Sequence, residues 1–238
     1  MLAKSLAIVI GSVKYGDSSV ILKCYSRNFG LISFIAGGVR GKKGGMKSAM
    51  MLPLNQGEVV FYEKGKSSLR RLKEFSSPRV YSEMYFHPVK NCLVMFLAEV
   101  LSHVLKEEEP EPNLFDFLSE SLFLLDSQQS ELGNFHLTFL YNLSAFLGFQ
   151  AQNSDSNFFD LQNGVYLNQE PLHPYYLKGK SLENWKKLST SARKGESLKA
   201  ISSNEREDLL KALMSYYRLH INDFGELKSL EVLQTILH

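Results

Sequence analysis

Basic and aromatic side chains alternate along residues 19–27 at the spacing of a β-strand. On such a strand Lys23, Tyr25 and Arg27 share one face, and Val20, Leu22 and Cys24 share the other. An aromatic ring can stack on a nucleic-acid base for about 1–3 kcal/mol, while flanking cations follow the phosphate backbone. The pattern therefore predicts a contact with single-stranded nucleic acid at Lys23, Tyr25 and Arg27.

Further candidate contacts lie in a turn before this strand, in a glycine-rich loop over residues 37–47, and on a strand near residue 70. The loop carries four basic side chains among five glycines, so its backbone and its side chains can both approach phosphates closely. These candidates are Lys14, Tyr15, Arg40, Lys42, Lys43, Lys47, Arg70, Arg71 and Lys73. Taken singly, a strand tyrosine more often packs half-buried, and a Gly-Lys loop is more often a surface connection. Their combination in one small domain favours binding, with weak sequence preference because no base-reading helix accompanies it.

Catalytic and metal-binding motifs are missing from the sequence. Residues 37–43 (GGVRGKK) lack the glycine spacing and the Ser or Thr of a phosphate-binding loop, and neither Gly-x-Ser-x-Gly nor His-Glu-x-x-His occurs. Glu99 and His103 share a helix face, which is more typical of a surface hydrogen bond than of a metal or acid–base pair. Cys24 and Cys92 are the two cysteines, too few for a disulfide framework or a cysteine-rich zinc site. We predict a protein that is not an enzyme and that has no cofactor or metal.

Charge is distributed unevenly along the 238 residues. Residues 1–80 carry 14 basic and 4 acidic side chains, whereas the remainder carries 13 basic and 21 acidic ones. Each phosphate that a Lys or Arg neutralises releases condensed counterions, so a strongly basic segment favours a polyanionic partner. The first 80 residues are therefore the predicted nucleic-acid-binding part, and the acidic remainder is predicted to present a partner surface.

Hydrophobic periodicity divides the chain at the same place. Five segments before residue 77 alternate with period two, and turn-forming residues such as 55–57 separate them, which predicts a five-stranded antiparallel barrel of the OB type. After Pro88, apolar residues recur at spacings of three and four, which predicts helices. We predict an α+β protein with an OB-fold domain over residues 1–80 and a mainly helical domain over 81–238. An irregular insertion near 150–177 is predicted to hold a hairpin at residues 163–164.

The N-terminal residues have no cleavage-site pattern, and no apolar run reaches the roughly 18 residues that a bilayer span needs. We therefore expect a cytoplasmic protein that makes no membrane contact.

Six segments, taken in order, resemble the RecO family of bacterial recombination mediators. They are residues 11–22 (GSVKYGDSSVIL), 25–40 (YSRNFGLISFIAGGVR), 52–54 (LPL), 114–118 (LFDFL), 147–149 (LGF) and 227–233 (LKSLEVL). Each segment alone is moderately specific. Their order and spacing carry the resemblance over nearly the whole chain.

The resemblance implies an OB fold followed by a helical domain, and a non-catalytic role in recombinational DNA repair. It implies binding of single- and double-stranded DNA, annealing of complementary strands, and contact with the C-terminal tail of single-stranded DNA-binding protein. It also implies that the protein loads RecA together with RecR, in the bacterial cytoplasm at the nucleoid.

One feature departs from the family pattern. Many relatives carry a four-cysteine zinc site after the LGF segment, whereas residues 150–164 of this chain contain no cysteine. No zinc is therefore predicted, and the insertion must be held by packing instead. The residues expected to pack there are Phe158, Phe159, Leu161, Val165 and Tyr166.

Two alternatives remain open. An RNA-binding OB-fold protein would prefer RNA through contacts to the 2′-hydroxyl group. A protein-interaction scaffold would bind a protein through its barrel and nucleic acid only weakly. A metal-dependent nuclease is less favoured, because the basic part contains four acidic residues without a carboxylate cluster.

Overall fold

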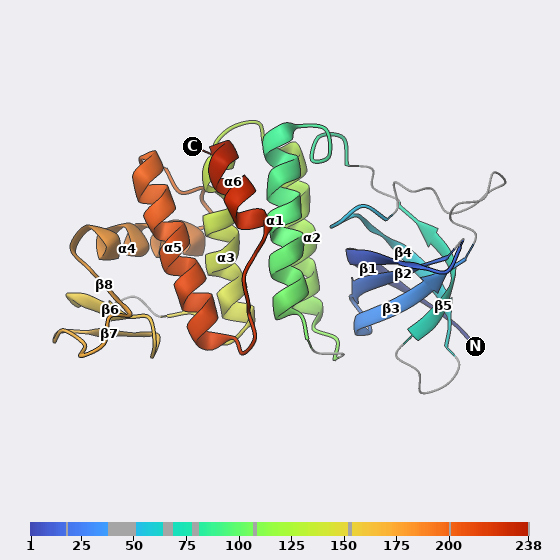
Figure 1. The fold of residues 1–238 in the computed structure, drawn as a ribbon, viewed down its shortest axis with the longest axis horizontal. Helices are drawn as coiled ribbons and strands as arrows, with labels where there is room; N and C mark the ends of the chain where they lie inside the picture. Colours follow the sequence, from blue (N-terminus) through green and yellow to red (C-terminus); the bar gives the residue numbers. More distant parts are fainter. Residues whose placement is uncertain are drawn as a thin grey trace. The chain divides into compact units, whose positions relative to one another are not determined.

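The computed structural model describes residues 1–17, 19–37, 51–63, 69–77, 81–106, 109–151, 154–199 and 201–237. The chain forms two compact units, Met1–Ser127 and Gln128–His238. Figure 1 shows a β-barrel and two helices in the first unit, and helices beside a small sheet in the second. No helix within the described ranges is long and apolar enough to cross a membrane.

Five strands form a closed barrel in the first unit (Figure 1). They are β1 (Leu2–Tyr15), β2 (Ser19–Ser26), β3 (Gly30–Ala36), β4 (Gln56–Tyr62) and β5 (Leu69–Ser76). The order around the barrel is β1-β2-β3-β5-β4, and the predicted OB-type barrel is confirmed. The prediction of a wholly antiparallel barrel is wrong, because β3 and β5 pair in parallel. Strand directions cannot alternate around a closed ring with an odd number of strands, so at least one pairing must be parallel.

Alternation along the strands places one side of each strand inside the barrel. The buried core consists of Ala7, Val9, Val20, Leu22, Cys24, Ile32, Phe34, Ala36, Val59, Phe61, Leu72 and Phe75. The rings of Phe34 and Phe61 lie 5.1 Å apart between centroids. Burial raises the pKa of the Cys24 thiol to about 12, so the side chain behaves as a neutral apolar group at neutral pH. The inward orientation predicted for the apolar side of β2 is confirmed.

The turn predicted at residues 55–57 lies earlier in the chain. Leu54 has a φ of 60°, the N–H of Asn55 donates to the carbonyl of Leu52, and β4 already begins at Gln56. Gly57 lies within the strand, where a Cβ would come 2.4 Å from the Phe75 ring. The glycine therefore permits close packing inside the barrel and does not form the turn.

Two helices complete the first unit: α1 (Pro88–Val104), which begins at Pro88 as predicted, and α2 (Pro112–Ser127). Asp126, near the end of α2, joins the two helices. Its carboxylate accepts the N–H groups of Glu83 and Met84 at 2.8 Å each, and its carbonyl accepts a hydrogen bond from Lys90 Nζ at 2.7 Å. Burial would raise the pKa of Asp126, but the hydrogen bonds to its carboxylate lower the pKa below its ordinary value. Helix α2 is thus tied to the start of α1 by a carboxylate that stays ionised at neutral pH.

The second unit is mainly helical, as predicted. It contains the short 3₁₀ segment η2 (Leu132–Asn134), α3 (Phe135–Phe146), β6 (Phe158–Asp160), β7 (Val165–Leu167), β8 (Tyr176–Lys178), α4 (Gly179–Arg193), α5 (Ser203–His220) and α6 (Ser229–Leu237). Helix α3 packs against α4 and α5. The predicted hairpin is confirmed, and Gly164 supplies its left-handed residue with a φ of 67°. Strand β8, which extends the hairpin to a sheet in the order β7-β6-β8, was not predicted.

Apolar packing holds most of this small sheet in place. The Phe159 ring is fully buried and stacks on Trp185 of α4 with centroids 5.0 Å apart. Leu161 is also buried. The packing role predicted for Val165 is wrong, because Val165 lies on the edge strand β7 and is 44% exposed.

Candidate nucleic-acid interface

The outer side of the barrel carries a row of side chains that runs around all five strands. Pairing partners in a sheet share a face, and the register connects one outward residue of each strand to the next. In order, they are Val13 of β1, Ile21 of β2, Ile35 of β3, Arg71 of β5, Tyr62 of β4 and Leu2 at the other end of β1. We call these six residues the outer row.

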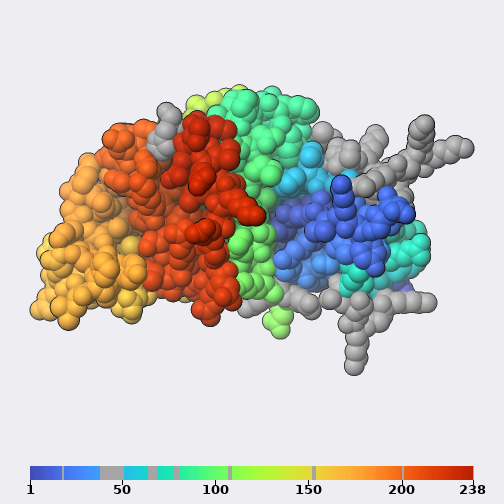
Figure 2. Space-filling model, viewed as in Figure 1, coloured from blue at the N-terminus to red at the C-terminus, as the bar shows by residue number. Residues whose placement is uncertain are grey.

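Two of the predicted contacts lie beside the outer row on the same face. Tyr15 on β1 and Lys23 on β2 are each two residues from a member of the row, about 7 Å along the strand. Val13 is 68% exposed, Tyr15 50% and Tyr62 41%, while Arg71 is exposed and Lys23 is half-buried. We call the outer row together with Tyr15 and Lys23 the exposed barrel face. Figure 2 shows β1 and β2, in blue, on the molecular surface.

The exposed barrel face combines three kinds of side chain. Tyrosine rings offer flat surfaces on which unstacked bases can lie, and apolar residues extend these surfaces. The cations beside them can neutralise phosphates. Because the row encircles a closed barrel, a single strand that contacts several of these side chains has to follow the curve of the barrel with its bases toward the protein.

Tyr25, the central residue of the predicted binding strand, is not part of this face. It follows Lys23 on the same side of β2, yet it is only 3% exposed. Its pairing partner Ile8 is fully buried, and neither residue belongs to the barrel core. Helix α1 packs against β1 in the same unit. The expectation that Tyr25 presents an open ring to a base is wrong, because this end of the outer side is covered.

Arg27 is engaged by a carboxylate of α2. Its Nε and one terminal nitrogen each lie 2.9 Å from an oxygen of Asp116. The hydrogen bond from Arg27 lowers the pKa of Asp116 below its ordinary value. The same helix is tied to the barrel by Ser119, whose hydroxyl donates to Gln56 Oε1 at 2.9 Å. A phosphate at Arg27 would therefore have to compete with Asp116.

The other predicted contacts are dispersed. Lys14 belongs to β1, not to a turn, and Lys14 and Arg70 are both aligned with core residues on the inward side of their strands. The Nε of Arg70 is buried and has no hydrogen-bond partner among the described residues. Lys73 is exposed on β5, two residues beyond Arg71. The loop residues Arg40, Lys42, Lys43 and Lys47 lie outside the described residues.

Sequence reasoning proposed Tyr15, Lys23 and Arg71 as contacts but missed the apolar and aromatic members of the outer row. These are Leu2, Val13, Ile21, Ile35 and Tyr62. A signal for them was present. The alternation that directs Val20 and Leu22 inward also directs Ile21 outward, so an apolar residue outside a small barrel called for an explanation.

The closed five-stranded barrel, its exposed face and the helices that follow define an OB-fold protein with a helical C-terminal part. Residues 1–80 match the family model described as Recombination protein O N terminal, and residues 86–231 match Recombination protein O C terminal. The chain belongs to the RecO family, a family of DNA repair and recombination proteins.

Relatives named DNA repair protein RecO are similar along their full length. The chain is 37% identical to the relative from Christiangramia forsetii, 34% to that from Phocaeicola vulgatus and 33% to that from Flavobacterium psychrophilum. Each alignment covers 99% of this chain and 99% of the relative. The resemblance found in the sequence is confirmed.

The zinc site that the resemblance implies for many relatives does not fit this chain. Residues 150–178 contain no cysteine, and the carboxylate of Asp160 in this segment already accepts hydrogen bonds from within the protein. Its carboxylate accepts hydrogen bonds from the N–H groups of Gln162 and Asn163 and lies 3.3 Å from His173 Nε2. Within the described ranges, no group of three or more His, Cys, Asp or Glu residues could hold a metal ion.

Proposed function

We propose that this protein is a non-catalytic recombination mediator that binds single- and double-stranded DNA and anneals complementary strands. The observation that carries the proposal is the exposed barrel face, where Tyr62 pairs with Arg71, and where Tyr15 and Lys23 each lie two residues from the Val13–Ile21 pair. Residues 1–80 form the proposed DNA-binding domain, to which the basic loop over residues 37–47 would add phosphate contacts. Residues 81–238 form the proposed helical partner domain.

The proposed mechanism needs no bond chemistry. One strand lies on the exposed barrel face with its bases on the tyrosine rings and its phosphates at the cations. The positive surface then screens the repulsion between this strand and a complementary one, so the two can pair.

The partner roles are proposed from family membership. They are contact with RecR, contact with the C-terminal tail of single-stranded DNA-binding protein, and assistance in loading RecA. We assign none of them to particular residues, and we place the protein in the bacterial cytoplasm at the nucleoid.

One experiment tests the DNA-binding and annealing parts together. A labelled single-stranded DNA oligomer is titrated with the protein over a salt series and followed by fluorescence anisotropy, and annealing of a complementary strand is scored in parallel. We expect affinity to fall steeply with salt and annealing to accelerate. A clear preference for RNA of the same sequence would favour an RNA-binding protein. No binding at low salt would favour a protein-interaction scaffold.

A further inference from the structure

Basic side chains of the second unit are concentrated in one segment. Residues 178–199 carry seven basic and two acidic side chains, although the chain beyond residue 80 is acidic as a whole. Four of the seven are engaged with described carboxylates or carbonyl groups; they are Lys178, Lys180, Lys186 and Arg193. The other three, Lys187, Lys194 and Lys199, form no ion pair within the described part of the chain.

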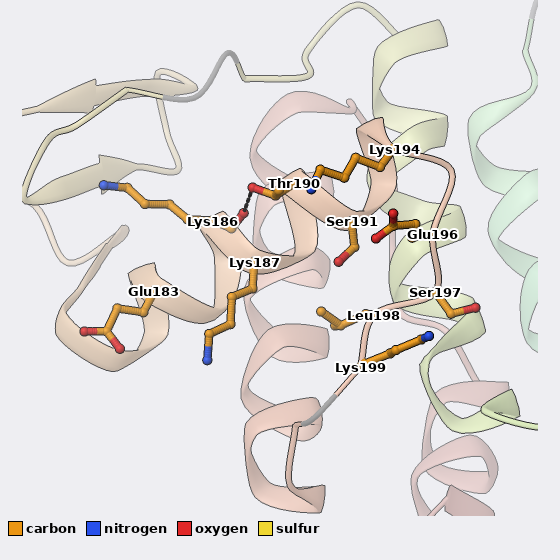
Figure 3. Close-up of a pocket in the computed structure, with 10 residues that line it drawn as sticks. All are labelled: Glu183, Lys186, Lys187, Thr190, Ser191, Lys194, Glu196, Ser197, Leu198 and Lys199. Atoms are coloured by element: carbon orange, nitrogen blue, oxygen red, sulfur yellow. Dashed lines mark hydrogen bonds between the residues drawn. The ribbon is translucent and has the colours of Figure 1, made fainter.

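These three lysines line one groove of about 570 Å³ between α4 and the loop that follows it (Figure 3). Ser191 of the helix and Leu198 of the loop also line the groove, as does Lys186, whose Nζ donates to the carbonyl of Ser156 at 3.0 Å. Glu183 and Glu196 also line the groove, and neither forms an ion pair with a described lysine. The lining therefore carries four lysines and two glutamates, a net positive charge.

Hydrogen bonds hold the loop in place beside the helix. The N–H of Glu196 donates to the carbonyl of Ser191 at 3.0 Å, and Asn134 Nδ2 donates to the carbonyl of Leu198 at 2.7 Å. Leu198 is only 1% exposed. Because the walls are anchored, a ligand would not have to order the backbone of the groove, which reduces the entropic cost of binding.

We propose that this groove binds the phosphates of a nucleic-acid strand, as a second strand site separate from the exposed barrel face. This inference rests on the proposed DNA-binding function. Ammonium groups bind phosphates as point charges, and three along one groove that form no ion pair with described residues match a repeating polyanion. The groove is open to solvent, which suits a strand passing through it better than a small ligand that must be enclosed. A protein that pairs two strands gains by holding each on its own positive surface, because their mutual repulsion is then screened.

The test compares three charge-reversal variants with the unmodified protein. The groove variant is K187E/K194E/K199E. The control variant K211E/R218E/K228E makes the same change in net charge at exposed side chains of the same unit that do not line the groove. The barrel variant is K23E/R71E. Binding of a short labelled oligo-dT at low protein concentration measures the tighter strand site, which we expect to be the barrel site because it adds stacking to charge. The rate of pairing between two complementary labelled strands measures the joint action of both sites.

We expect the groove variant to bind oligo-dT within about twofold of the control variant while annealing about tenfold more slowly. The barrel variant is expected to bind oligo-dT about tenfold or more weakly and to anneal more slowly as well. Failure of the unmodified protein to bind oligo-dT would overturn the proposed function and this inference together. Normal binding with equal annealing by the groove and control variants would overturn this inference alone.

Two further results would also overturn it. In the first, the groove variant anneals normally but loses binding of a labelled poly-glutamate peptide, which would make the groove a site for acidic protein segments. In the second, the groove variant has a lower melting temperature and unchanged annealing, because a cation such as Lys194 at the end of α4 also offsets the helix dipole. If the triple reversal does not fold, K187Q/K194Q/K199Q answers the same question with a smaller expected effect.

Discussion

Strand β2 joins two parts of the barrel surface that differ in their exposure. Lys23 belongs to the exposed barrel face, whereas Tyr25, two residues further on the same side, is buried, and Arg27 just beyond the strand is paired with Asp116. The strand directs Lys23 and Tyr25 to the same side. What differs is their burial, because helices of the same unit are attached at one end of the strand. The comparison teaches that alternation assigns a side of a strand but does not decide which part of that side meets solvent.

The largest expected effect is a difference in stability between a substitution in the buried part of this surface and one in the exposed part. Tyr25→Ala should lower the free energy of unfolding by about 3 kcal/mol or more, because it removes a large buried aromatic side chain. Tyr15→Ala, at a half-exposed position, should lower it by less than about 0.5 kcal/mol. Urea unfolding followed by circular dichroism measures both changes. A Tyr25→Ala protein that is as stable as the unmodified one would contradict the burial of this ring.

A charge reversal on the exposed barrel face should have the next largest effect. K23E/R71E should weaken binding of single-stranded DNA by about tenfold or more, and lower the slope of log affinity against log salt by about 1.4, since each lost phosphate contact contributes about 0.7. Anisotropy titrations over a salt series measure both quantities. R218E/K228E makes the same charge change in the second unit outside the proposed groove and should leave the slope unchanged. Equal losses in the two variants would point to a nonspecific charge effect.

Removing the rings should have a smaller effect with a different signature. Tyr62→Ala or Tyr15→Ala should weaken single-strand binding by about 1 kcal/mol, roughly fivefold, because each ring can stack one base. The salt slope should stay the same, since no cation is lost. Duplex binding should change less, because paired bases are already stacked. Tyr62→Phe keeps the stacking surface and should restore affinity, and a failure to do so would assign the role to the hydroxyl group.

The barrel and the helical part could be predicted from periodicity because both depend on local alternation of apolar residues. The direction of the β3–β5 pairing could not be predicted in that way, since it follows from closing a ring of five strands. The candidate contacts Tyr15, Lys23 and Arg71 were proposed from residue type. The burial of Tyr25 is indicated neither by residue type nor by the alternation along β2.

The outer row shows a second limit of prediction from the sequence. Ile21, Ile35 and Tyr62 carry no charge, and a search for basic patches passes over them. Only the register shows that Ile35 and Tyr62 pair with Arg71 and that Ile21 pairs with Ile35. Register is set by long-range pairing, and the sequence of a single strand does not contain it.

The smallest expected effect concerns the ion pair at the covered end. Asp116→Asn removes the charge that Arg27 contacts, and the pKa of Asp116 is lowered in the folded state by the hydrogen bond from Arg27. A carboxyl whose folded pKa is depressed adds stability above its unfolded pKa of about 3.9, and this stability is lost as the pH falls through the lower, folded value. The melting temperature of Asp116→Asn should therefore be slightly below that of the unmodified protein at neutral pH, and the two should converge in acid. Glu58→Gln breaks a second exposed ion pair, with Lys4 on the neighbouring strand, and serves as the matched control.

DNA affinity should be unchanged in Asp116→Asn if Arg27 serves only to attach the helix. A rise in affinity, with a steeper salt slope, would instead show that Arg27 becomes a phosphate contact once its carboxylate is removed, and that the two parts of the barrel surface form one site.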